Sequence, residues 1–436
     1  MRNTESSPLR RVVVTGVGAV TPLGLSAPET WQNIKLGNSG ISSVDIPHSQ
    51  IKVAGLVHNF NAAEALYGIL SKKELMRVGR VAQMSTAAAY EALQDAALLD
   101  EDNKLHSDFD PTRIGTRIGT GMGGGSEIPG IDTKIEQDKR ISALSILRIL
   151  PERVASVPSM TFNLQGPLET PAAACATGNS AIIGGVQQIQ LGRADRMVVG
   201  GVEAYVDRTG LGIFQAIHAL SRQTDPSIAS RPFDKGRDGF VMAEGAGVLV
   251  LEEYEKALER GATMYGEVIG YGSAADAGGD TDPTGDGAYR SMRDALPERS
   301  KLLRSGVVYV NAHATSTPIG DSAEYSSISR LVEDEEGSSM YVSSSKGSLG
   351  HTLGAAGAIE SIISLNALRE GVVPPNVNLV DPLCEDEGII LPQEMVETPV
   401  VIALNNSFGF GGINSSVAFA HAEDNVAFAD PSRFYK

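Results

Sequence analysis

Short apolar strands alternate with helical segments along most of the chain, and this alternation restricts the fold more than any other feature. In a first series, we predict strands at residues 11–15, 114–125, 197–200 and 248–251, with a long alanine-rich helix at 80–99. After a charged helix at 252–260, a second series places strands at 265–270, 307–311, 341–344 and 401–405, with helices at 321–331 and 357–370. Strands that alternate with helices predict α/β layers with mostly parallel sheets.

The two series resemble each other. Each contains a turn of small residues beside a regular element, at residues 171–180 in the first series and at 405–415 in the second. We therefore predict two related halves, residues 10–261 and 262–422, with the functional site between them. Residues 1–9 and 423–436 are predicted to be flexible tails.

Composition excludes several classes of protein. The 436 residues are 42% hydrophobic and 20% charged, as in a soluble globular protein with two core-forming units. Two cysteines cannot form a disulfide framework, so we expect a reducing compartment. No apolar run approaches the ~18 residues of a membrane span, so no membrane insertion is expected. The net charge of −17 argues against nucleic acid as the main partner.

A glycine-rich stretch at residues 16–24 follows the first strand and looks at first like a dinucleotide-binding turn. Thr21 occupies the place of the third glycine, and no acidic residue ends a second strand at the required distance. The stretch is therefore not interpreted as a nucleotide site.

Cys175 is the strongest candidate nucleophile. It lies among small residues, and the apolar spacing of Ile182, Ile183, Val186 and Ile189 predicts that a helix follows it. A thiol at the start of a helix has its pKa lowered by the free N–H groups and the helix dipole. Cys384 has acidic neighbours, which disfavour a thiolate, and is interpreted as structural or incidental.

Two histidines follow strands in glycine-containing loops, where ligands bind in α/β folds. They are His313 and His351, and Lys346 lies five residues before the second one. Glu360, in the next apolar helix, needs a charge partner, for which Lys346 is suited. The chain has no CxxC, HxxxH or HExxH motif, so a zinc site is not expected. Residue types alone leave a Cys-His hydrolase possible.

Four motifs carry a resemblance to a known family. They are AACATG at 173–178, NAHATST at 311–317, SKGSLGH at 345–351 and NSFGFGG at 406–412, supported by RPFDKGRDGFVMAEGAG at 231–247. With these motifs the chain resembles the elongating type II β-ketoacyl-acyl-carrier-protein synthases of the thiolase superfamily, and among these the mitochondrial form. The resemblance implies a thiolase-like fold of two pseudo-symmetric halves, each with a mixed, mostly parallel sheet, stacked in α-β-α-β-α layers.

The resemblance also implies a decarboxylative Claisen condensation. Cys175 would carry an acyl group, His313 and His351 would stabilise the enolate of malonyl-carrier protein, and Lys346 would set the electrostatics of the site. The backbone N–H groups of Cys175 and Phe410 would bind the oxyanion. No cofactor is expected, because the carrier protein brings the phosphopantetheine.

Further roles follow from the same resemblance. Phe410 would be a mobile gate hinged on Gly409, Gly411 and Gly412. The residues expected to support the catalytic groups are Glu360, Asp321 and Glu324, and those expected to contact the pantetheine arm or the acyl chain are Thr315, Thr317, Phe214, Met122 and Phe408. Residues 125–161 fit the family pattern poorly, and Gly278 and Gly279 replace bulkier residues, so the preferred acyl length stays open.

The implied partners are acyl carrier protein and a second copy of the chain in a homodimer. Because the carrier protein is acidic in this family, a local basic surface is needed. Two clusters suit it: Lys72, Lys73, Arg77 and Arg80 on one predicted helical stretch, and Lys139 with Arg140. The subfamily resemblance favours the mitochondrial matrix, with the bacterial cytoplasm as the alternative.

Two other functions of the same fold remain. A thiolase uses a second cysteine in the C-terminal glycine-rich loop, whereas residues 408–412 contain none. An inactive partner subunit lacks the nucleophile, whereas this chain retains Cys175 together with His313, His351 and Lys346.

Overall fold

The computed structural model describes residues 9–279, 283–296, 306–334, 339–384 and 386–422. The predicted flexible tails lie outside these residues, apart from Leu9.

One mixed sheet passes through the described part of the molecule. Its strands, in chain order, are β1 (Val12–Val20), β4 (Ile114–Gly119), β5 (Leu168–Glu169), β6 (Arg196–Glu203), β7 (Gly245–Glu253), β8 (Gly266–Ala275), β9 (Val307–Asn311), β10 (Met340–Ser343), β12 (Ile389–Ile390), β14 (Val400–Gly409) and β15 (Ile413–Ala420). Their spatial order is β12-β10-β9-β14-β15-β8-β1-β7-β6-β4-β5. The strand positions predicted from the sequence are confirmed, with longer bounds for most of them.

The strand directions repeat in the two halves of the sheet. Outward from β1, the pairings with β7 and β6 are antiparallel, and those with β4 and β5 are parallel. Outward from β8, β15 and β14 pair antiparallel, and β9 and β10 pair parallel. The halves meet in a short antiparallel ladder in which Val13 faces Glu267 and Val14 faces Gly266. The sequence-based prediction of two pseudo-symmetric halves is therefore visible in the sheet itself.

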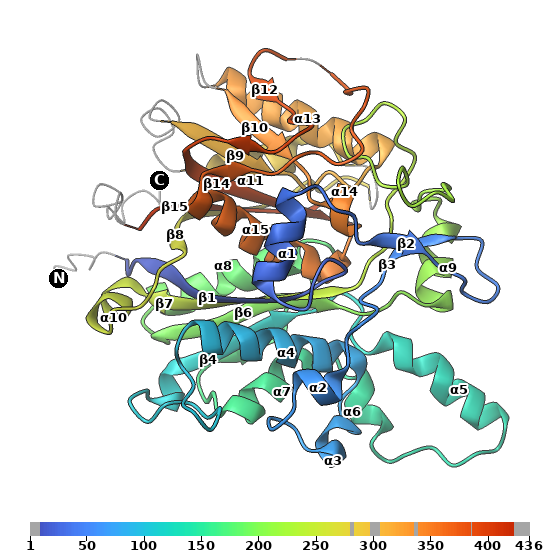
Figure 1. Ribbon diagram of the computed structural model, residues 1–436, viewed down its shortest axis with the longest axis vertical. Coiled ribbons are helices and arrows are strands. Elements are labelled where there is room, and N and C mark those ends of the chain that lie inside the picture. The colour runs from blue at the N-terminus through green and yellow to red at the C-terminus, as the bar shows by residue number, and fades with distance from the viewer. Residues whose placement is uncertain (1–8, 280–282, 297–305, 335–338, 385, 423–436) are drawn as a thin grey trace.

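The helices complete five layers (Figure 1). Between the two halves of the sheet lie α8 (Thr177–Gln190) and α15 (Ala356–Glu370), and residues 356–368 of α15 are all buried. The outer face of the N-terminal half is covered by α4 (Arg80–Asp95) and α7 (Arg153–Phe162). The outer face of the C-terminal half is covered by α11 (Asp286–Ala295) and α13 (Pro318–Glu333).

The glycines after the first strand do not form the turn predicted for residues 16–24. Strand β1 continues to Val20, because Gly16 and Gly18 face α4 at very short range. A Cβ atom on Gly16 would lie 2.2 Å from the carbonyl oxygen of Ala92, and one on Gly18 would lie 2.1 Å from that of Ala88. These glycines therefore permit a helix to pack on the strand.

The remaining elements are short. They are α1 (Ala27–Lys35), α2 (Ala62–Ala65), α3 (Lys72–Leu75), α5 (Ile128–Glu136), α6 (Ser145–Ile149), α9 (Arg208–Ala216), α10 (Tyr254–Glu259) and α14 (Lys346–Leu349), with the strand pairs β2 (Ile41–Ser43) and β3 (Val53–Gly55), and β11 (Val372–Val373) and β13 (Val396–Glu397). Helix α5 projects from the molecule and buries none of its residues (Figure 1). Among the described helices, none has the length and apolar character that a membrane crossing needs.

Candidate active site

A strained turn presents Cys175 ahead of helix α8. Ala174 has a φ of 47°, in the left-handed region that a non-glycine residue rarely adopts. The Thr177 hydroxyl fixes the turn, since it accepts the Ala173 N–H at 2.8 Å and donates to the Ala174 carbonyl at 2.7 Å. The predicted place of Cys175, just before a helix, is confirmed. Strain held by local hydrogen bonds is typical of a functional position.

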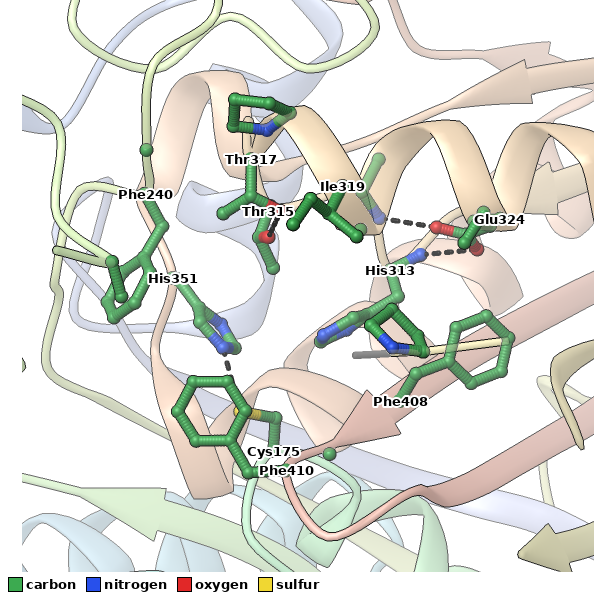
Figure 2. A pocket seen from close by; sticks show the side chains of 18 of the residues that line it. Cys175, Phe240, His313, Thr315, Thr317, Ile319, Glu324, His351, Phe408 and Phe410 are labelled. Carbon is green, nitrogen blue, oxygen red and sulfur yellow. Dashed lines mark hydrogen bonds between the residues drawn. The ribbon is translucent and has the colours of Figure 1, made fainter. Parts of the chain in front are cut away.

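His351 contacts the thiol directly (Figure 2). Its Nε2 lies 3.0 Å from Sγ of Cys175. The backbone of His351 is fixed at both of its polar groups, because its N–H donates to Val241 O at 2.7 Å and its carbonyl accepts the Ala243 N–H at 2.9 Å. The imidazole is thereby aimed at the sulfur.

His313 lies beside His351, with ring centroids 5.3 Å apart and an interplanar angle of 81°. Glu324 of α13 holds its backbone: the carboxylate accepts the His313 N–H at 2.9 Å and the Ala314 N–H at 2.6 Å (Figure 2). Asn406 donates to the same carboxylate at 3.0 Å. The structure thus brings both histidines to Cys175 and gives Glu324 a supporting position.

Lys346 and Glu360 form an ion pair in the interior, as the sequence predicted. Their side chains are 1% and 2% exposed. Ser345 also donates to this carboxylate, at 3.3 Å. A buried pair of this kind is strongly destabilising to break, because either partner alone leaves an uncompensated charge.

The resting protonation state differs from the prediction. Burial raises the pKa of the Cys175 thiol to about 12, and the positive charge of Lys346 only partly opposes this effect. The predicted lowering of this pKa was wrong, because the sulfur lies in the interior and before the first turn of α8, so loss of water outweighs the helix dipole. Burial lowers the pKa of both His313 and His351 well below the usual histidine value, and the positive charge of Lys346 lowers it further. The site therefore rests as a neutral thiol beside two neutral imidazoles.

A cavity of about 490 Å³ surrounds this cluster. Of the residues expected to contact substrate, Phe214, Thr315, Thr317 and Phe408 line it, and so do Gly409, Phe410 and Gly412 of the predicted gate. Met122 is not among the lining residues; the residue is 37% exposed, and its backbone N–H donates to Glu203 at 3.1 Å. The predicted acyl-pocket role of Met122 therefore has no support within this chain alone.

The Phe410 loop lies against the nucleophile turn. A Cβ atom on Gly409 would lie 2.8 Å from the carbonyl oxygen of Ala173 and 3.2 Å from the Cys175 nitrogen. Gly411 and Gly412 have φ angles of 79° and 70°, which favour glycine. Phe410 is 39% exposed and lies beside Cys175 (Figure 2), and its ring centroid is 6.4 Å from that of Phe214. This arrangement suits both the predicted gate and a paired oxyanion site.

Two supporting residues were not identified from the sequence. Buried Glu203, at the end of β6, accepts hydrogen bonds from Thr120 and from the backbone N–H groups of Gly121, Met122 and Gly354. Burial raises its pKa to about 7. The sequence did contain a signal for Glu203: it is an acidic residue at the end of an otherwise apolar strand, shortly after Gly200 and Gly201.

Arg237 is the second. It donates to Thr317 O at 3.0 Å and Pro318 O at 2.8 Å, and it lies 3.7 Å from Asp321. Asp321 is fully buried, which raises its pKa to about 6, and it accepts the Phe233 N–H. Asp321 therefore supports the loop that carries Thr317, without lining the cavity. Arg237 lies inside the quoted motif at 231–247, although no role was assigned to it.

The first basic cluster does not form one helical stretch. Lys72 and Lys73 are exposed on α3, which ends at Leu75, and Arg77 is half-buried after it. Arg80 begins α4 and pairs at 2.7 Å with the buried carboxylate of Glu244, so its charge is already neutralised within the chain. Lys139 and Arg140 are exposed after α5.

Known proteins are similar to this chain in sequence and in fold. The N-terminal domain of beta-ketoacyl synthases matches residues 9–257, and the C-terminal domain matches residues 265–380. The 3-oxoacyl-[acyl-carrier-protein] synthase 2 of Staphylococcus aureus (strain N315) is 38% identical over 95% of this chain and 99% of its own, and that of Vibrio harveyi is 38% identical over 94% and 98%.

Solved structures agree. A beta-ketoacyl synthase from Burkholderia phymatum STM815 superposes with a TM-score of 0.84 at 31% identity, over 95% of this chain and all of its own. A ketosynthase described in complex with a type II PKS acyl-carrier protein gives a TM-score of 0.82 at 29% identity, over 95% of this chain and all of that one. With its Cys-His-His site and matches across both halves, the chain belongs to the β-ketoacyl synthase family.

Proposed function

We propose that the protein is a 3-oxoacyl-acyl-carrier-protein synthase of type II fatty acid synthesis, which condenses malonyl-carrier protein with an acyl group held on Cys175. One observation carries the proposal: Sγ of Cys175 lies 3.0 Å from Nε2 of His351, with His313 in the same cavity. A single thiol next to two neutral imidazoles suits acyl transfer followed by stabilisation of an enolate.

The first half-reaction loads the acyl group. His351 accepts the thiol proton, and the sulfur attacks the thioester carbonyl of acyl-carrier protein. The backbone N–H groups of Cys175 and Phe410 donate hydrogen bonds to the oxyanion and stabilise it. The carrier-protein thiolate then leaves and receives the proton from His351, so the enzyme retains an acyl-cysteine.

The second half-reaction forms the carbon–carbon bond. Malonyl-carrier protein loses CO₂, and the electron pair of the broken bond becomes an enolate whose oxygen accepts hydrogen bonds from His313 and His351. The enolate carbon attacks the acyl-cysteine carbonyl, and the C–S bond breaks. The Cys175 thiolate takes up one proton from solvent, which restores the thiol, and β-ketoacyl-carrier protein leaves. No cofactor takes part, because the phosphopantetheine arm belongs to the substrate.

The partners belong to the same proposal. The exposed Lys72 and Lys73 on α3 offer a basic contact for an acidic carrier protein. A ketosynthase of similar fold is described in complex with an acyl-carrier protein.

Strand β5 lies at an edge of the sheet, where Leu168 is 41% exposed. Met160, on the preceding helix, is 63% exposed. An open strand edge with exposed apolar side chains suits pairing with a second copy. The mitochondrial matrix and the bacterial cytoplasm stay the two predicted locations.

The competing functions make different demands. A thiolase needs a second thiol near the nucleophile. Among the described residues that line the cavity, Cys175 is the only cysteine, and Cys384 is exposed elsewhere. An inactive carrier-binding subunit needs no intact Cys-His-His site. The geometry therefore favours a decarboxylating condensing enzyme.

Mass spectrometry of the intact protein after incubation with acyl-carrier protein tests this function. We expect one acyl adduct, which is absent in Cys175→Ala and present in the matched control Cys384→Ala. Addition of malonyl-carrier protein should discharge the adduct and release β-ketoacyl product. An adduct that survives Cys175→Ala, or rapid cleavage of acetoacetyl-CoA without any use of malonyl-carrier protein, would contradict the proposal.

A further inference from the structure

One sulfur and two nitrogen atoms that can bind a metal meet in the cavity. Sγ of Cys175 and one nitrogen each of His313 and His351 all lie within 4.8 Å of one another, and all three side chains are buried. They come from three distant segments of the chain, so no metal-binding spacing marks them in the sequence. A thiolate and two imidazoles are ligands that Zn²⁺ prefers.

The separations suit a single ion after small side-chain rotations. Zinc binds sulfur at about 2.3 Å and imidazole nitrogen at about 2.0–2.1 Å, so tetrahedral donors lie about 3.5 Å apart. The Cys175–His351 pair is at 3.0 Å, and the widest pair is at most 4.8 Å. All three residues line the cavity, which leaves room for a water as fourth ligand, as in zinc sites with three protein ligands.

The charges near the three donor atoms are compatible with a bound cation. The charge of Lys346 would repel a cation, but Glu360 pairs with it in the interior. Metal binding breaks the S–H bond of Cys175, forms an S–metal bond and releases one proton to solvent, with no change of oxidation state.

The surroundings argue for reversible capture. Permanent metal sites fix each histidine by a hydrogen bond to its second nitrogen. Here the buried Nδ1 atoms of His313 and His351 have no hydrogen-bond partner among the described residues. Outer hydrogen bonds of this kind are worth about 10- to 100-fold in affinity, so the ion is held less tightly than in a structural site.

We propose that Cys175, His313 and His351 together form a reversible inhibitory site for a thiophilic divalent cation such as Zn²⁺. A metal-bound sulfur cannot attack a thioester, so occupancy by the ion and acylation of Cys175 exclude each other. A chelator restores the free thiol.

The test uses the full chain, freed of metal by a chelator. Co²⁺ serves as the spectroscopic probe, because a sulfur–cobalt charge-transfer band reports thiolate coordination and ignores binding to surface carboxylates. Protection of Cys175 from iodoacetamide by Zn²⁺ is measured by peptide mass mapping. At ten times the dissociation constant, alkylation should slow about tenfold and recover on addition of chelator.

Three variants make the outcome decisive, each checked for an unchanged melting temperature. Cys384→Ser should keep the band and the protection, Cys175→Ser should lose the band, and His313→Gln should weaken protection about tenfold or more while the thiol remains. A band that persists in Cys175→Ser, a band lost in Cys384→Ser, or protection unchanged in His313→Gln would overturn the site. None of these measurements requires condensing activity, so the inference and the proposed function fail independently.

Discussion

His351 Nε2 and Cys175 Sγ lie 3.0 Å apart although 176 residues separate them in the chain. Burial makes the thiol a weak acid and keeps the imidazole uncharged. In the proposed acylation, the thiol proton therefore passes to His351 across this contact.

Replacing His313 should separate the two half-reactions. His313→Ala removes one donor to the enolate, which should slow decarboxylation of malonyl-carrier protein about 10²- to 10³-fold. Self-acylation should continue, because the contact with the thiol belongs to His351. CO₂ release and acyl-adduct formation are measured separately, with the exposed His58→Ala as control. Equal loss in both half-reactions would contradict these separate roles.

Glu324 should act through the position of His313. In Glu324→Gln, one of the two backbone N–H groups of His313 and Ala314 must face an amide donor, which costs about 1–3 kcal/mol of stability. We expect a lower melting temperature together with slower decarboxylation. Glu333→Gln, on the exposed end of the same helix, is the matched control and should change neither. A Glu324→Gln variant with normal decarboxylation would show that the carboxylate has no positioning role.

Lys346 should set the acidic limit of the pH profile. Burial and Lys346 both lower the pKa of His351, so activity should persist at a pH well below the usual histidine value of about 6.5. Lys346→Met removes the repelling charge, so the pKa of His351 rises and the acidic limb of self-acylation moves to higher pH. The exposed Lys104→Met is the control. An unmoved limb in Lys346→Met would contradict the electrostatic role.

The same burial affects stability. Because the folded protein lowers the pKa of both histidines, the unfolded chain binds more protons below about pH 6.5. The contribution of these two histidines to the free energy of unfolding should therefore decrease as the pH falls through that range. Comparison of wild-type and His313→Gln unfolding at pH 8 and pH 5.5 measures it, and a difference independent of pH would exclude it.

The Phe410 loop should depend on its glycines. Gly411 has a φ of 79° and open space around it, so Gly411→Ala costs backbone strain of about 1 kcal/mol without a clash. We expect slower condensation with a similar melting temperature. Gly68 has a φ of 77° and equally open surroundings, so Gly68→Ala carries the same strain away from the cavity and should leave condensation unchanged. Equal rates in the two variants would show that the loop needs no hinge at Gly411.

Charge reversal on α3 should weaken carrier-protein binding. The double change Lys72→Glu and Lys73→Glu should raise KM for acyl-carrier protein at low salt, with a smaller effect at high salt. Arg80→Gln should instead lower the melting temperature, because it leaves buried Glu244 without its partner. Unchanged KM in the double variant would show that these lysines are only a solvated surface.

Much of the site was predictable because its residues lie in short local motifs. Cys175 before a helix, His313 and His351 after strands, and the Lys346–Glu360 pair were all predicted from the sequence, and the structure brings them together. The matched strand orders also agree with the two echoing halves of the sequence.

Other features depended on contacts between distant segments. The carboxylate of Glu203 joins the loop after β4 to the turn at Gly354, and Arg237 holds the carbonyl of Thr317. Arg80 was assigned to a docking surface because its sequence neighbours are basic, whereas its partner Glu244 lies 164 residues away.

The sequence by itself determined which atoms can react: a thiol in a tight turn, two imidazoles in loops after predicted strands, and a lysine with a carboxylate to pair with. Only the tertiary structure decided their protonation and their mutual distance. Burial depends on what every other segment packs against the site, so the thiol predicted to be acidic is a weak acid. Packing also places sulfur and two ring nitrogens within 4.8 Å, where the same three groups that suit condensation also suit a metal ion.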